Sequence, residues 1–134
     1  MSDEEFLQAL ENCTLPQGLF THPAHVRAGY LYLKKFSFAE ALGRMRRSIC
    51  DYANHLGKSD QYHETVTVAY LALIQQCMFE RGDGGEWTAF AHHNPELFDP
   101  ELLSRFYDRN VLESALARRV FLLPRINDED RPRR

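Results

Sequence analysis

The stretch SFAEALGRMRRSICDYANHLG, residues 37–57, carries the start, face and stop signals of one α-helix. Ser37 followed by Glu40 is a capping-box pattern, in which each side chain bonds the backbone N–H of the other residue. Apolar residues recur at spacings of three and four, which puts them on one helix face: Ala41, Leu42, Met45, Ile49, Tyr52 and Ala53. Gly57 is the residue type that most readily adopts the left-handed conformation after a helix. The stretch therefore predicts an amphipathic helix that packs on a helical core.

Similar signals recur on both sides of this stretch. Apolar residues at helical spacing, with caps, prolines or glycines at the ends, predict further helices at residues 3–12, 21–35, 61–81, 86–93, from 100 onward and 110–121. The longest of these helices is expected to bury Leu73. No stretch alternates at strand spacing with turn signals at both ends. The sequence thus predicts an all-α fold, a compact single-domain bundle of six or seven helices.

The length and composition of the chain predict one domain and a short tail. A chain of 134 residues, 44% hydrophobic and 26% charged, is long enough to bury a core without metal or disulfide support. We place the helical domain at residues 1–124. Residues 125–134 hold one large apolar side chain among four arginines and three acids, and they are expected to form a mobile charged tail.

Charge and hydropathy argue against several classes of partner. The net charge of −3 disfavours a general electrostatic grip on nucleic acid or on an anionic membrane, because both need positive charge. The longest apolar run, residues 68–74, is far shorter than the roughly 20 residues that span a bilayer. The first residues are acidic, whereas a signal peptide begins with basic ones. Three dispersed cysteines predict no disulfide framework. We therefore expect a cytoplasmic protein with no nucleic-acid or membrane partner.

Three of the six histidines lie where two predicted helices begin. His22 and His25 are three residues apart at the start of one helix, and His63 lies in the first turn of the longest helix. The positive end of a helix dipole disfavours imidazolium and keeps histidine neutral. Neutral imidazole is the form that ligates metals or acts as a base. His22, His25 and His63 are therefore predicted to bind one divalent transition metal, since ligands from two helices are what a bundle site requires.

Two charged residues accompany these histidines. Glu64 is predicted to be a fourth ligand or a general base. Arg27 is predicted to pair with Glu64 or to hold an anionic group of a substrate. Imidazole ligands suit zinc, iron, nickel and copper nearly equally, so the metal is left open. The corresponding function is a metal-dependent protein, or a metal-dependent enzyme that acts on a small molecule.

The same residues allow a second interpretation without metal. The histidines, Arg27 and Glu64 would then form a buried hydrogen-bond network in a non-catalytic module that binds a partner or a small ligand. Four tyrosines spaced to pack between the two helices are candidates for lining such a site: Tyr30, Tyr32, Tyr62 and Tyr70. An apolar helix face left exposed would also support a homodimer. Whether the protein is an enzyme stays open at this point.

Two segments carry a resemblance to a known family. Phe20-Thr21-His22-Pro23-Ala24-His25-Val26-Arg27 and Tyr62-His63-Glu64-Thr65-Val66-Thr67, followed by residues 120–124, resemble a family of small, uncharacterised, all-helical bacterial proteins with FTHxxHxR and YHETxT motifs. The similarity covers residues 20–124. It implies no particular reaction, but its motifs match the residues selected above, together with Thr65 and Thr67, two polar β-branched residues at a helix start that a pure packing face would not favour.

Overall fold

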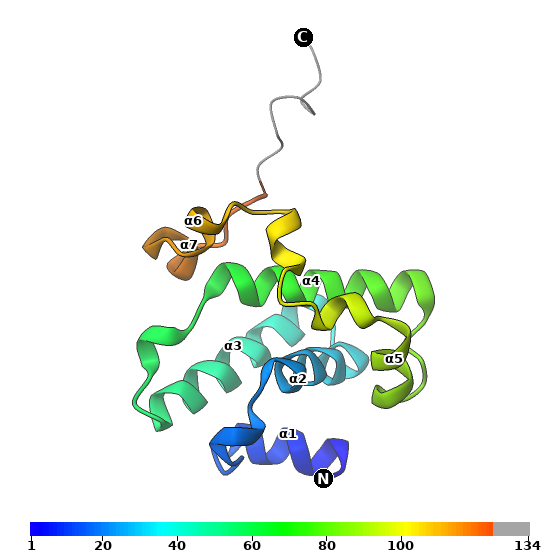
Figure 1. The fold of residues 1–134 in the computed structure, drawn as a ribbon. Helices are drawn as coiled ribbons and strands as arrows, with labels where there is room; N and C mark the ends of the chain where they lie inside the picture. The colour runs from blue at the N-terminus through cyan, green and yellow to red at the C-terminus, as the bar shows by residue number, and fades with distance from the viewer. Residues whose placement is uncertain (125–134) are drawn as a thin grey trace.

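Helix α4 (Glu64–Arg81) lies at the centre of the computed structural model, which describes residues 1–124 (Figure 1). It packs against α2 (His22–Lys35) and α3 (Phe38–His55), which also pack against each other. Helix α1 (Asp3–Glu11) covers the far side of α3. Across these 124 residues the structure has seven α-helices and no strand, and the predicted all-α class is confirmed.

Shorter elements complete the described chain. Helices α6 (Arg109–Leu112) and α7 (Ala115–Arg119) lie on the side of α4 opposite to α2 and α3, and α5 (Trp87–His93) packs against α2 (Figure 1). Four 3-10 turns join the helices: η1 (Gln17–Leu19), η2 (Ser59–Gln61), η3 (Pro95–Phe98) and η4 (Leu102–Arg105). The predicted tail, residues 125–134, lies outside the described residues.

Gly57 ends α3 as its sequence predicts, and the Ser37 half of the predicted capping box starts it. The hydroxyl of Ser37 accepts the backbone N–H of Glu40 at 3.3 Å. Gly57 follows the helix with φ of +73°, a conformation in which a side chain is strained. A complete capping box, with both reciprocal bonds, starts α1 between Ser2 and Glu5. These caps satisfy backbone groups that have no partner inside the helix.

Helix α4 begins three residues later than its sequence predicts. Residues 59–61 form a 3-10 turn, and His63 has the extended backbone of an N-cap, with φ of −131° and ψ of 106°. Its Nδ1 accepts the backbone N–H of Val66 at 3.1 Å. His63 therefore precedes the helix and caps it, whereas the sequence placed it in the first turn.

The C-terminal segment is less regular than predicted. Ser114 caps α7 by accepting the backbone N–H of Ala117 at 3.1 Å, which divides the helix expected at 110–121 into α6 and α7. The following residues attach to the start of α4 through Thr65. Its hydroxyl donates to the carbonyl of Val120 at 2.8 Å and accepts the N–H of Leu122 at 3.2 Å. Thr65 is fully buried, so its hydroxyl finds both of its hydrogen-bond partners within the protein.

The core lies between α1, α2, α3 and α4. Its largest fully buried side chains include three tyrosines and one phenylalanine: Tyr30, Tyr32, Tyr52 and Phe90. From α4, Leu71, Ile74 and Cys77 are buried, while Leu73 is only partly buried. The predicted burial of Leu73 is therefore only partial, because Leu71, Ile74 and Cys77 form the inward face of α4 and Leu73 lies at its edge. Within residues 1–124, no helix is both long and apolar enough to cross a membrane.

Candidate functional site

His22 and His25 line one pocket between α2, α3 and α4, which we call the histidine pocket. Its volume is about 290 Å³. The lining consists of His22, His25 and Val26 from α2, Met45 and Ile49 from α3, and Val66, Thr67, Tyr70, Leu71 and Ile74 from α4. The first turn of α2 thus places both imidazoles at a junction of three helices. The sequence predicted a shared site for these two histidines, and the structure brings them together.

His25 is held in a defined orientation and protonation state. Its Nδ1 lies 2.9 Å from the carbonyl oxygen of Thr21, and its ring stacks on Phe20 with a centroid distance of 3.9 Å. A carbonyl oxygen only accepts, so Nδ1 carries a proton. Burial lowers the pKa of His25 below its ordinary value of 6.5, which makes the neutral ring the form at pH 7. The other nitrogen, Nε2, is then an unprotonated acceptor.

His22 is fixed by a backbone carbonyl and an aromatic ring. Its Nε2 lies 2.9 Å from the carbonyl oxygen of Leu97 in η3 and therefore donates to it. Its ring meets Tyr70 edge-on at a centroid distance of 4.9 Å. The Leu97 carbonyl and the Tyr70 ring thereby set the direction of the imidazole. Each of the two histidines donates one ring N–H to a backbone carbonyl, and its other ring nitrogen remains an acceptor.

The predicted metal site of His22, His25 and His63 is wrong. His63 uses both ring nitrogens elsewhere, since Nδ1 caps α4 and Nε2 donates to the carbonyl of Leu112 at 2.6 Å. It does not line the histidine pocket. Throughout the described part of the chain, no group of three or more His, Cys, Asp or Glu residues is placed to hold a metal ion. The zinc, iron, nickel or copper function inferred from the spacing is therefore contradicted.

Glu64 and Arg27 are not partners of each other. Glu64 accepts hydrogen bonds from Arg46, with Nε at 2.8 Å, and from the hydroxyl of Tyr62 at 2.6 Å. Arg27 binds Asp3 of α1, with Nη2 2.6 Å from Oδ1. Hydrogen bonds from Arg46 lower the pKa of Glu64, which makes it a weaker base than an ordinary glutamate. Neither residue lines the histidine pocket, and a His/Arg/Glu network is not formed.

Of the four candidate tyrosines, Tyr70 alone lines the histidine pocket. The hydroxyls of the other three donate to protein groups elsewhere, to the carbonyl of Asp83 and to the carboxylates of Glu11 and Glu64. Met45 and Ile49 also line the pocket, although their apolar spacing predicts only core positions of α3. The apolar pattern gives no signal that separates a residue lining a pocket from one that fills a core.

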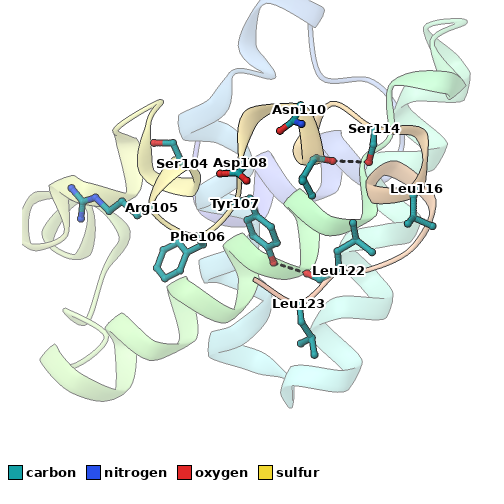
Figure 2. A pocket seen from close by; sticks show the side chains of 11 residues that line it. Ser104, Arg105, Phe106, Tyr107, Asp108, Asn110, Ser114, Leu116, Leu122 and Leu123 are labelled. Atoms are coloured by element: carbon teal, nitrogen blue, oxygen red, sulfur yellow. Dashed lines mark hydrogen bonds between the residues drawn. The ribbon is translucent and has the colours of Figure 1, made fainter. Parts of the chain in front are cut away.

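A second, larger hollow lies in the C-terminal segment, where Figure 2 shows its lining. Its volume is about 480 Å³, and on one side Tyr107 donates to the carbonyl of Leu122 at 2.7 Å. Its lining mixes exposed leucines, Leu116 and Leu123, with charged and polar residues such as Arg105 and Asp108. None of the histidines lines it. For these reasons we take the histidine pocket as the candidate functional site.

Comparison with known proteins identifies no relative of this chain. No protein-family model, no curated protein and no solved structure matches it.

Proposed function

We propose that the protein binds a small, largely apolar molecule in the histidine pocket. The observation that supports this proposal is the convergence of two fixed imidazoles with Thr67 and Tyr70 on a pocket whose other lining residues are all apolar. Ligand pockets in proteins combine apolar walls with a few well-placed polar groups in this way. This is the ligand-binding alternative of the sequence analysis, without the Arg27 and Glu64 network.

The size and lining of the pocket define the class of ligand. A volume of about 290 Å³ is near the lower end of the roughly 300–1,000 Å³ typical of ligand pockets. The lining contains no Asp, Glu, Lys or Arg. A charged group would lose its hydration there without gaining an opposite charge, which costs several kcal/mol. The ligand we propose is therefore neutral and no larger than one or two fused rings.

Methyl NMR provides a direct test, because seven lining residues carry methyl groups: Val26, Met45, Ile49, Val66, Thr67, Leu71 and Ile74. A set of neutral aromatic and aliphatic fragments is titrated into methyl-labelled protein. We expect several fragments to shift these signals saturably and to leave the methyl groups of Val111 and Leu116, which border the C-terminal hollow, unchanged.

A matched pair of variants separates binding in the pocket from binding elsewhere. Val66→Trp adds bulk at a lining position, whereas Val68→Trp adds the same bulk two residues further along α4, outside the lining. Fragment binding should be lost in the first variant and retained in the second, with both shown to be folded by circular dichroism. Equal binding to both variants, or no saturable shift with any neutral fragment, would contradict the proposal.

A further inference from the structure

Two polar residues of the histidine pocket, His25 and Thr67, offer hydrogen-bond acceptors. His25 donates through Nδ1 to Thr21, so its neutral ring presents Nε2 as an acceptor. Thr67 donates its hydroxyl proton to the carbonyl of His63 at 2.8 Å, which leaves the oxygen lone pairs as its remaining capacity. Two acceptors therefore border the pocket before any ligand arrives.

Two polar atoms of the pocket have no protein partner. Nε2 of His25 and the hydroxyl of Tyr70, which can donate as well as accept, have no hydrogen-bond partner among residues 1–124. The same residues contain no buried side-chain nitrogen or oxygen that lacks a partner, so both atoms are open to a solvent-sized molecule. An accessible acceptor in an apolar wall gains most from a ligand that supplies a donor, because binding otherwise strips it of water.

We infer that the ligand class of the histidine pocket is a neutral apolar molecule with an O–H or N–H donor, such as a phenol, an indole or a secondary amide. The donor binds Nε2 of His25, and the apolar body contacts Met45, Ile49 and Ile74. An ether or an ester of the same shape offers only acceptors, so it can accept from the Tyr70 hydroxyl but makes no hydrogen bond to Nε2 of His25. A carboxylate also lacks a donor, and its negative charge would lose hydration in a lining that has no cationic side chain. This inference rests on the proposed binding function.

Phenol, anisole and benzoate form a matched set of probes, because they share one ring and differ in donor, acceptor and charge. Their dissociation constants are measured by methyl NMR at pH 7.5, where phenol is neutral. We expect phenol to bind about tenfold more tightly than anisole, the ratio that one net hydrogen bond supplies, and benzoate to bind more weakly than either.

His25 variants test the acceptor itself. His25→Phe keeps an aromatic ring on Phe20 but removes Nε2, and it should lower phenol affinity to that of anisole. His25→Gln restores a carbonyl acceptor and should recover part of the preference. His92→Phe, an exposed position on α5 outside the lining, serves as the matched control and should change neither probe.

A pH series on the wild-type protein gives a readout that does not depend on how the variants fold. Protonation turns Nε2 of His25 from acceptor to donor, so the preference for phenol over anisole should disappear as the pH falls below 6.5 towards 4.5. The titratable and charged groups near His25 are His22 and Tyr70 in the pocket, and Lys58, Tyr52 and Tyr62 in the adjoining hollow that His25 also lines. The His25→Phe variant should lack this pH dependence.

The outcomes distinguish the inference from the function on which it rests. If phenol and anisole both bind in the pocket with equal affinity at pH 7.5, the donor requirement is wrong and the binding function stands. If benzoate binds most tightly, the acceptor assignment of His25 is wrong. If no probe and no other neutral fragment shifts the lining methyl groups, the binding function itself is wrong.

Discussion

Nε2 of His63 donates to the carbonyl oxygen of Leu112 at 2.6 Å, and this contact joins the start of α4 to the end of α6. The carbonyl is one of those at a helix C-terminus that have no partner inside the helix. Because Nδ1 of the same ring caps α4, one imidazole satisfies a backbone group at each of two helix ends. Two bonds through one ring explain why this residue is a histidine, without any metal.

Substitution of His63 should show both bonds in the free energy of unfolding. His63→Asn keeps a side-chain acceptor for the Val66 N–H but does not reach Leu112, and we expect a loss of about 1 kcal/mol. His63→Ala removes both bonds and should cost about 2 kcal/mol. Urea denaturation followed by circular dichroism measures the difference. Equal stability of the alanine variant and the wild type would show that the ring contributes nothing to either helix end.

Thr65→Val should release the segment that follows α7. The substitution keeps the shape of the side chain but leaves the Val120 carbonyl and the Leu122 N–H without their buried partner, at a cost of about 1–3 kcal/mol. The amide of Leu122 should also exchange with solvent faster. Thr67→Val is the matched control, because that hydroxyl donates to the nearby carbonyl of His63 and does not reach the segment after α7. An unchanged exchange rate at Leu122 in the first variant would contradict the contact.

The ion pair of Glu64 and Arg46 should make stability depend on pH in acid. Hydrogen bonds from Arg46 lower the pKa of Glu64 below its ordinary value of 4.5, so the folded state favours the carboxylate. This stabilisation is fully present above pH 4.5 and is lost as the pH falls through the lower, folded-state pKa. Glu64→Gln should therefore cost about 0.5–1 kcal/mol at pH 7 and nothing at the acid end. Chemical denaturation at several pH values measures the difference.

A control for this effect is the exposed pair of Glu40 and Arg44, which are 3.9 Å apart on the surface of α3. Glu40→Gln should change the free energy of unfolding by less than Glu64→Gln at every pH. A larger effect at Glu40 would mean that the short contacts of Glu64 carry no special stabilisation.

His25 should make stability depend on pH nearer to neutrality. Burial lowers its pKa below the ordinary value of 6.5, so the unfolded chain takes up a proton before the folded protein does. Stability conferred by the neutral ring is present above pH 6.5 and falls as the pH drops from 6.5 to the folded-state pKa. In His25→Phe this part of the pH dependence should vanish. Denaturant midpoints at pH 7.5 and 5.5, compared between the two proteins, are the measurement.

The helices with clear local signals could be predicted from the sequence. Capping by Ser37, the glycine stop at Gly57 and apolar spacing of three and four are interactions between residues close in the chain, and they act whatever packs around them. The bounds of α1, α2, α3 and α5 follow from such signals. The C-terminal turns did not follow, because Ser114 divides a helix whose apolar spacing continues across it.

The site could be predicted only in part. Helical spacing was sufficient to place His22 and His25 together at the start of α2. It could not say that His63 faces α6, that Arg27 pairs with Asp3 of α1 or that Glu64 pairs with Arg46 of α3, because these partners are 18 to 49 residues away in the chain. Which basic side chain pairs with which carboxylate depends on how the helices pack. No local pattern in a single sequence indicates that pairing.

The hydrogen bonds of Thr65 also affect the order in which parts of the protein fold during its synthesis. Its hydroxyl meets backbone groups 55 and 57 residues further along the chain. While a ribosome is still adding the residues between them, α4 can form and pack on α2 and α3, but the hydroxyl at its first turn has none of its final partners. The first turn of the central helix is therefore completed only after Leu122 has left the ribosome, so folding on the ribosome should proceed in at least two stages.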